Sequence, residues 1–181
     1  MKVTQTPLAG ILLIEPRVFS DDRGFFYESH QQKRYQELGL PEFLQDNISR
    51  STRNTLRGLH FQQPNAQGKL VWVTRGKVWD VMVDIRRSSP TYKKWFGMTL
   101  SDEHPLQIYI PPGFAHGFCV LSDEADFCYK CTDYYSPATE QGIQWNDPEL
   151  NIEWPVTQPL LSPKDMTYPT LSEIEHDKLF A

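Results

Sequence analysis

The feature that most constrains the fold is a succession of short, largely apolar stretches separated by glycine, proline and polar residues. In KLVWVTRGKVWDVMVDIR, residues 69–86, apolar and polar side chains alternate on both sides of Arg75-Gly76, which predicts a β-hairpin at that dipeptide. Similar stretches follow at residues 93–100, 106–112, 115–121 and 125–135. Strands at this regular spacing predict an all-β fold, an antiparallel barrel or sandwich of the jelly-roll kind with a few short helices.

The residues before this region add smaller elements. Gly10–Phe19 is an apolar run that contains a proline, and it predicts an edge strand because proline cannot donate a hydrogen bond to a neighbouring strand. The segment SDDRGFFYES, residues 20–29, predicts a tight turn that leads into aromatic residues. Gln31–Leu38 is expected to form a short helix that ends at Gly39.

The end of the chain differs in composition from the strand region. After Tyr135 it is rich in proline and acidic turns, and Leu171–Leu179 is expected to form a terminal helix. No internal repeat or domain boundary is visible, and an apolar fraction of 39% is that of a folded protein. We therefore expect residues 1–181 to form a single domain.

Charge and cysteine content limit the possible partners and the compartment. A net charge of -5 and a pI near 5.5 argue against a broad basic surface, so nucleic acid is not expected as a partner. Met1–Ile14 lacks the pattern of a secretory signal, and no apolar stretch is long enough to span a bilayer. Three cysteines, an odd number, fit a reducing compartment. These observations predict a cytoplasmic protein without a membrane partner.

The stretch FCYKCTDYY contains a CxxC pair, Cys128 and Cys131. On a strand, positions three apart point to opposite faces, so these sulfur atoms are not expected to converge on a metal. The same alternation places Phe127, Tyr129, Cys131 and Asp133 on one face. A buried tyrosine is most often a core residue, although its hydroxyl can also donate a proton in catalysis.

An arginine, a glycine and a histidine interrupt the stretch LRGLHFQ, which otherwise has the pattern of a buried strand. Alternation places Leu59 and Phe61 on one face and Gly58, His60 and Gln62 on the other. A glycine inside a strand often marks a close approach of another chain segment to the backbone. Taken alone, the histidine is more often a buried structural residue than a functional one.

Two carboxylates, Asp80 and Asp84, share one face of the strand that follows Arg75-Gly76. One interpretation is a solvated outer face, because polar alternation is common in antiparallel sheets. The other is a polar barrel interior, in which an aspartate could orient a catalytic imidazole.

The stretch PPGFAHGF, residues 111–118, resembles the PxGxxH signature of the cupin superfamily, and His116 stands where many cupins keep a metal ligand. The other half of a cupin metal site is an HxH pair, but here His60-Phe61-Gln62 has no second histidine. Two histidines are fewer ligands than zinc or non-haem iron usually takes. The sequence therefore predicts chemistry without a metal.

Several segments together resemble the dTDP-4-dehydrorhamnose 3,5-epimerase family. They are DDRGFFYES, LQDNISRS, LRGLHFQ, NAQGKLVWV, IPPGFAHGF, YKCTDYYSP, IQWNDPELNIEWP and LSPKD. The resemblance runs from about residue 3 to residue 170 in order and spacing. It implies a cupin-type jelly roll that forms a homodimer, uses no metal or organic cofactor, and epimerises C3 and C5 of dTDP-4-dehydro-6-deoxy-D-glucose.

The resemblance also implies roles for particular residues. His60 corresponds to the general base, Asp165 to its partner in a dyad, Tyr129 to the general acid, and Lys69 to the residue that stabilises the enolate. The positions that correspond to residues holding the dTDP-sugar are Arg23, Glu28, Gln45, Asn47, Arg57, Lys69, His116, Glu140 and Lys164.

Three classes of function remain open from the sequence. The first is the double epimerase. The second is a single-site 3- or 5-epimerase, or a 3,4-ketoisomerase, that serves another dTDP-deoxysugar. The third is a non-catalytic cupin that binds a sugar or nucleotide, which has no need of a base, an acid and an enolate-stabilising lysine together.

Overall fold

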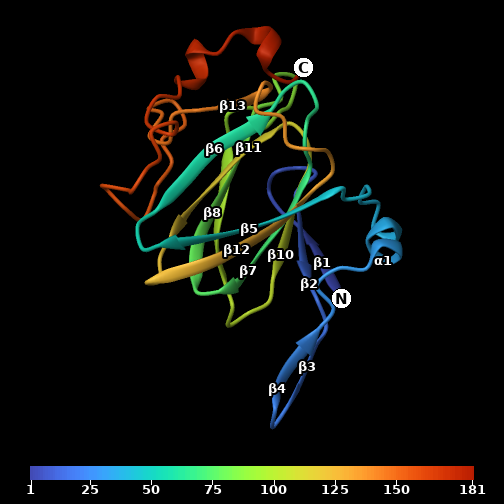
Figure 1. Cartoon of the computed structure of the whole chain (residues 1–181). Coiled ribbons are helices and arrows are strands. Elements are labelled where there is room, and N and C mark those ends of the chain that lie inside the picture. Colours follow the sequence, from blue (N-terminus) through green and yellow to red (C-terminus); the bar gives the residue numbers. More distant parts are fainter.

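The computed structural model describes residues 1–181 as two antiparallel sheets packed face to face (Figure 1). The six-stranded sheet has the order β1 (Lys2–Gln5), β2 (Leu12–Glu15), β10 (Gln107–Ile110), β7 (Lys69–Arg75), β12 (Glu124–Cys131) and β5 (Gln45–Thr52). The five-stranded sheet has the order β13 (Glu140–Gly142), β6 (Leu56–Gln62), β11 (Phe114–Val120), β8 (Lys77–Asp84) and β9 (Trp95–Ser101). This architecture confirms the predicted all-β jelly-roll class.

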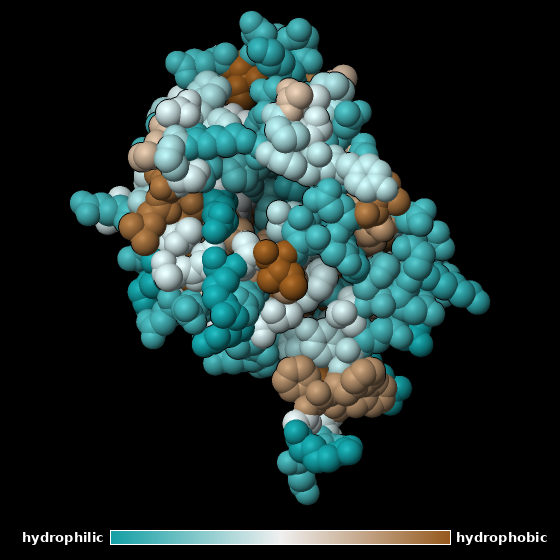
Figure 2. Space-filling view, in the orientation of Figure 1, coloured by the Kyte–Doolittle hydropathy of each residue, from teal (hydrophilic) through white to brown (hydrophobic).

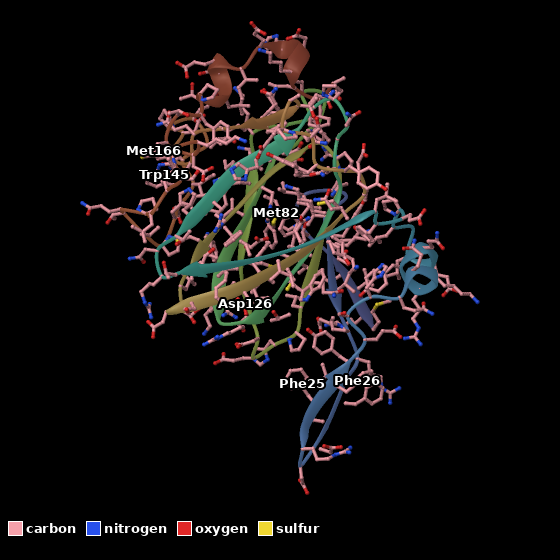
Figure 3. The ribbon with its side chains drawn as sticks, viewed as in Figure 1. Phe25, Phe26, Met82, Asp126, Trp145 and Met166 are labelled. Carbon is pink, nitrogen blue, oxygen red and sulfur yellow. The ribbon has the colours of Figure 1, made fainter.

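The largest hydrophobic core lies between the two sheets and includes Val71, Met82 and Phe127. Figure 3 shows Met82 in the middle of the barrel. A second core covers the outer face of the five-stranded sheet, where Leu59 and Val81 pack with apolar residues from the C-terminal segment. Strand alternation produces both cores, since successive side chains enter opposite ones.

The C-terminal segment is ordered against this outer face. The predicted helix at Leu171–Leu179 is instead two single turns of 3-10 helix, Leu171–Glu173 and His176–Lys178. Leu171 and Leu179 are both buried in the second core, so the segment extends over the sheet, and a continuous helix would shorten its reach.

The predicted hairpin at Arg75-Gly76 is wrong, because β7 and β8 belong to different sheets and do not pair. Gly76 has a φ of +77°, and a Cβ there would lie 2.1 Å from the carbonyl oxygen of Glu124. The tight turn is real, but it leads the chain from one sheet to the other. The alternation of apolar and polar residues within a strand does not depend on which sheet the strand joins, so it could not show that β7 and β8 lie in different sheets.

The predicted edge strand at Gly10–Phe19 is also wrong. Its first part forms β2, which lies between β1 and β10, and Pro16 follows the end of this strand. Its last residues belong to β3 (Val18–Asp21), which pairs with β4 (Gly24–Tyr27) in a hairpin that projects from the body (Figure 1).

The predicted early helix is confirmed as α1 (Gln32–Glu37). The side chain of Gln31 caps it by accepting a hydrogen bond from the backbone N–H of Arg34 at 2.8 Å. Gly39, with a φ of +82°, follows the helix, as expected for a residue that ends a helix. Tyr35 packs α1 against the outer face of the six-stranded sheet.

Candidate active site

A cavity of about 400 Å³ opens between the two sheets. Side chains from β5, β7 and β12 form one wall, and side chains from β6, β11 and β13 form the other. Its lining includes these residues expected to act in catalysis or to bind the nucleotide-sugar: Gln45, Asn47, Arg57, His60, Lys69, His116, Tyr129 and Glu140. The two sheets therefore bring together residues that are up to 95 positions apart, from Gln45 to Glu140.

The predicted faces of the LRGLHFQ strand agree with the structure. Leu59 and Phe61 are buried in the outer core and the imidazole of His60 lines the cavity, although Phe61 also borders the cavity. Gly58 allows the close approach that its position suggested, because a Cβ there would lie 2.5 Å from the Cα of Gly117 on the neighbouring strand. A larger residue would separate β6 from β11 next to His60.

The imidazole of His60 is joined to the carboxylate of Asp165, with 2.6 Å between Nε2 and Oδ1. A carboxylate accepts hydrogen bonds, so this contact places a proton on Nε2 and leaves Nδ1 as the nitrogen that can take one. The hydroxyl of Ser162 donates to the second oxygen of Asp165 at 2.7 Å. Burial raises the pKa of Asp165, but the hydrogen bonds from His60 and Ser162 outweigh it and hold this pKa below its usual range.

A second histidine–carboxylate pair lies deeper in the barrel. Nε2 of His116 is 2.7 Å from Oδ1 of Asp80, and the side chain of Asp80 is completely buried. This finding decides between the two interpretations of the Asp80 face, since both Asp80 and Asp84 point inward. Asp84 is the last residue of β8, and its carboxylate accepts hydrogen bonds from Arg86, among others.

Tyr129 and Lys69 face these histidines from the six-stranded sheet. Nζ of Lys69 is 6.0 Å from the ring centre of Tyr129. Burial raises the pKa of Tyr129 above its usual value of 10, so the phenol keeps its proton and can donate it at neutral pH. Burial lowers the pKa of Lys69, while Cys131 and Glu140 partly oppose that effect.

A cluster of charged and phenolic groups stands at the rim. The carboxylate of Glu140 pairs with the ammonium of Lys164 and accepts a hydrogen bond from the hydroxyl of Tyr135 at 2.7 Å. Burial raises the pKa of Glu140, but Lys164 and Tyr135 outweigh it and hold this pKa below its usual range. Two further lining residues, Gln45 and Asn47, are hydrogen-bonded to each other at 3.0 Å.

Three of the expected binding residues do not line the cavity of their own chain: Lys164, which stands at the rim, and two residues near the β3–β4 hairpin. Arg23, at the tip of the β3–β4 hairpin, is paired with Asp21, and its side chain is 90% exposed. Glu28, which follows β4, is paired with Arg34 at 2.8 Å. The hairpin that carries Arg23 also exposes Phe25 and Phe26, which form an apolar patch at the foot of the molecule (Figures 2 and 3).

The predicted opposite faces of Cys128 and Cys131 are confirmed. Cys131 lines the cavity, whereas Cys128 is near the hydroxyl of Thr74 on the opposite face of the sheet. No group of three or more histidine, cysteine, aspartate or glutamate side chains is placed to hold a metal ion. None of the helices is long and apolar enough to cross a membrane.

Sequence reasoning missed several residues near His60. Ser162 supports Asp165, Tyr135 contacts Glu140, and the ring of Tyr168 lies 5.7 Å from the imidazole of His60. Ser162 is the serine of LSPKD, three residues before the aspartate, which is a common spacing for a local hydrogen bond to a carboxylate. Nothing in the sequence pattern indicates the contact of Tyr168 with a residue 108 positions earlier.

Comparison with known proteins finds a matching family model and named relatives. A family model described as dTDP-4-dehydrorhamnose 3,5-epimerase matches residues 5–173. A relative of that name from Shigella flexneri is 57% identical over 169 residues, which cover 92% of this chain and 93% of the relative. A relative from Streptomyces niveus named dTDP-4-dehydrorhamnose 3-epimerase is 42% identical over 176 residues, which cover 96% of this chain and 85% of the relative.

A solved structure has the same architecture. It is a dTDP-6-deoxy-D-glucose-3,5-epimerase from Legionella pneumophila in complex with dTDP-4-keto-L-rhamnose. The two chains are 52% identical and superpose with a TM-score of 0.96 over 99% of this chain and 97% of the other.

Proposed function

The chain belongs to the dTDP-4-dehydrorhamnose 3,5-epimerase family, and we propose that His60, Asp165, Lys69 and Tyr129 carry out its reaction. That reaction inverts C3 and C5 of dTDP-4-dehydro-6-deoxy-D-glucose and gives dTDP-4-dehydro-L-rhamnose. Each inverted carbon is adjacent to the C4 ketone. Its proton is therefore removable only if negative charge on the ketone oxygen is stabilised.

Removal of the proton is assigned to His60. Its Nε2 is held by Asp165, so Nδ1 keeps a lone pair, and the carboxylate stabilises the imidazolium that forms when Nδ1 takes the proton. Lys69 is the cation that would stabilise the enolate oxygen, as donors in an oxyanion hole do. Its burial strengthens this interaction, because little water competes for the charge.

Return of the proton is assigned to Tyr129. Inversion requires a proton to leave one face of the sugar ring and another to arrive on the opposite face. The observation that supports this proposal best is that His60 and Tyr129 line the same cavity from different sheets. A substrate ring held between the sheets would have the base on one side and the acid on the other.

The nucleotide and diphosphate are assigned to the remaining lining residues and the rim. Arg57 is the cation on β6 that lines the cavity and could bind a phosphate oxygen. Its Nε donates to the hydroxyl of Ser51 at 3.0 Å, which orients the guanidinium. Gln45, Asn47, His116, Glu140 and Lys164 complete the set proposed to hold the dTDP-sugar.

A single-site 3-epimerase is the second candidate, favoured by the 42% identity to the Streptomyces niveus relative. The same base, acid and lysine would serve either enzyme, so the residue set does not separate them. Incubation with dTDP-4-dehydro-6-deoxy-D-glucose in deuterated water tests this directly. Two deuterons in the sugar, at C3 and C5, are expected for the double epimerase, and one deuteron would replace that proposal with single-site epimerisation.

We further propose that the chain acts as a homodimer. The β3–β4 hairpin carries Arg23 away from its own cavity and exposes Phe25 and Phe26, so a second copy could receive the hairpin and gain its arginine. Light scattering at working concentration is expected to show a dimer. A fully active monomer would contradict this proposal.

The whole chain is proposed to act as one catalytic domain in the cytoplasm. Its three cysteines are all free and buried, which suits a reducing compartment.

A further inference from the structure

One aromatic side chain touches the proposed base without lining the cavity. The ring of Tyr168 lies 5.7 Å from the imidazole of His60, centre to centre, and the two planes meet edge to face at 66°. Aromatic rings attract each other in this arrangement, and the contact restricts rotation of both. Tyr168 itself does not line the cavity that His60 lines.

The backbone places this ring tightly. A Cβ on Gly142 would lie 2.4 Å from two carbons of the Tyr168 ring, so the ring occupies the space that any other residue at this position would fill. Gly142 is the cross-strand partner of His60 in the pairing of β13 with β6. Tyr168 therefore packs across the backbone immediately beside the histidine.

The loop that supplies Tyr168 also supplies the partner of the base. Asp165 is three residues earlier, in a turn closed by a hydrogen bond from the N–H of Met166 to the carbonyl of Ser162. On the other side of Tyr168, the carbonyl of Pro169 accepts a hydrogen bond from the N–H of Gln144 at 2.8 Å. The first hydrogen bond shapes the loop around Asp165, and the second ties the loop next to Tyr168 to the segment that follows β13.

The hydroxyl of Tyr168 is buried near the ammonium of Lys164, but no group forms a hydrogen bond of good geometry with it. Burial and the nearby carboxylate of Glu140 outweigh the opposing effect of Lys164 and raise the pKa of Tyr168 to about 12, so the phenol is neutral at working pH. A neutral ring that excludes water is suited to protect a hydrogen bond between an imidazole and a carboxylate, which is stronger where water does not compete.

We propose that Tyr168 is a positioning residue for the proposed base: its ring holds the imidazole of His60 against Asp165 and keeps water from their hydrogen bond. This inference rests on the proposed role of His60. The aromatic ring of Tyr168 positions the imidazole, and its hydroxyl is not required. Removal of the ring should slow proton abstraction while leaving the nucleotide-binding side of the cavity intact.

The test compares Tyr168→Ala with Tyr168→Phe. Because small misplacements of a reacting group can cost about 100-fold, Tyr168→Ala should slow deuterium incorporation by about 10- to 100-fold. Tyr168→Phe should retain the parental rate of deuterium incorporation, and both variants should bind dTDP as the parent does. Met166→Ala, in the same loop with an exposed side chain, is the matched control and should retain parental incorporation (Figure 3).

A double-mutant cycle gives an independent measurement. Gly142→Ala inserts a methyl group into the space of the ring and should slow incorporation by itself, even if Tyr168→Ala fails to fold. In the Tyr168→Ala background that methyl group meets no ring, so the double variant should be no slower than Tyr168→Ala. The downfield proton signal of the His60–Asp165 hydrogen bond should weaken in Tyr168→Ala and Gly142→Ala and persist in Tyr168→Phe.

Several outcomes would overturn the inference. Parental incorporation by folded Tyr168→Ala or by Gly142→Ala would do so, as would equal losses in Tyr168→Phe and Tyr168→Ala, additive losses in the cycle, or a parallel loss of dTDP affinity. His60→Ala is the reference. If His60→Ala still incorporates deuterium at the parental rate, the proposed function fails. If only His60→Ala loses it, the inference about Tyr168 fails alone.

Discussion

The molecule contains two histidine–carboxylate pairs that face one cavity, and they differ in their surroundings. In His60–Asp165 the imidazole is 27% exposed and the carboxylate comes from a loop, whereas in His116–Asp80 the side chains are 8% and 0% exposed and come from adjacent strands. A proton-transfer group must reach substrate and change charge during turnover. A fully enclosed pair on two paired strands has less freedom to do either, which suits a fixed wall of the binding site.

The two pairs are also neighbours, because His60 and His116 are cross-strand partners in β6 and β11. One oxygen of Asp80 is buried without a hydrogen-bond partner, while both oxygens of Asp165 accept hydrogen bonds. Residue type therefore does not distinguish a base from a structural histidine. We propose that access to the cavity and complete hydrogen bonding of the partner carboxylate distinguish the base, and the following experiments compare the two pairs on that basis.

The largest effect is expected for His60→Ala. If this imidazole is the base for both carbons, its loss should abolish exchange of both substrate protons, and general bases typically contribute about 100-fold to 10,000-fold. His116→Ala should weaken binding of the nucleotide-sugar but keep exchange at saturating substrate. The rate of deuterium incorporation in the two folded variants measures the contrast, and equal losses would remove the distinction between the pairs.

Tyr129→Phe removes the proposed acid and leaves both pairs intact. The ring still packs against Phe127, but no hydroxyl remains to deliver a proton to the opposite face of the sugar. We expect deuterium incorporation at one carbon or both to continue while product of the L configuration falls by roughly 100-fold or more. Product stereochemistry and incorporation are measured side by side. Parental turnover would remove Tyr129 from the mechanism.

The sequence predicted the faces of the strands better than their partners. Alternation placed His60 opposite Leu59 and put Asp80 on the face that proved to be the interior, because the strand repeat is local. It could not assign β7 and β8 to different sheets, since the same alternation serves either arrangement. The hairpin prediction at Gly76 failed for that reason.

The partners of the two histidines illustrate a second limit. Asp165 lies 105 residues from His60, and no spacing or periodicity links them. That pair was expected only from the family resemblance. The projection of Arg23 away from its own cavity was equally invisible, because nothing in a local turn pattern shows which way a hairpin points relative to the body.

The two pairs should also differ in what they contribute to stability. Asp80→Ala leaves the buried imidazole of His116 without its partner, and breaking a buried pair in this way costs on the order of 3 kcal/mol. Asp165→Ala should cost less free energy of unfolding, because water can reach the imidazole of His60, which is 27% exposed. Denaturant unfolding of both variants gives the two free energies. A larger loss for Asp165→Ala would reverse the assignment of the structural pair.

A smaller effect is expected in acid. The pKa of Asp165 is lower in the folded chain than its ordinary value of 3.8, so its ionisation stabilises the fold above that pH, and this contribution is lost as the pH falls through the folded pKa. Asp165→Asn should therefore lose less stability than the parent as the pH is lowered below 4. Asp123→Asn, with a 95% exposed side chain, controls for removal of one charge. If the free energy of unfolding falls equally with pH in Asp165→Asn and in the parent below pH 4, the prediction is contradicted.

No effect on activity is expected when metals are removed. The second histidine of the cupin HxH pair would stand at position 62, but this residue is Gln62. Its side-chain amide donates to the carbonyl of Tyr134 and accepts from the N–H of Ser136. Nε2 of each histidine of the cavity, His60 and His116, is engaged by a carboxylate. Activity should thus survive exhaustive chelation and gain nothing from added zinc or iron. Turnover that disappears with stoichiometric removal of one ion, and returns when that ion is restored, would mean that a histidine leaves its carboxylate to bind metal. In that case the two pairs would have to be reinterpreted together as ligands of one site.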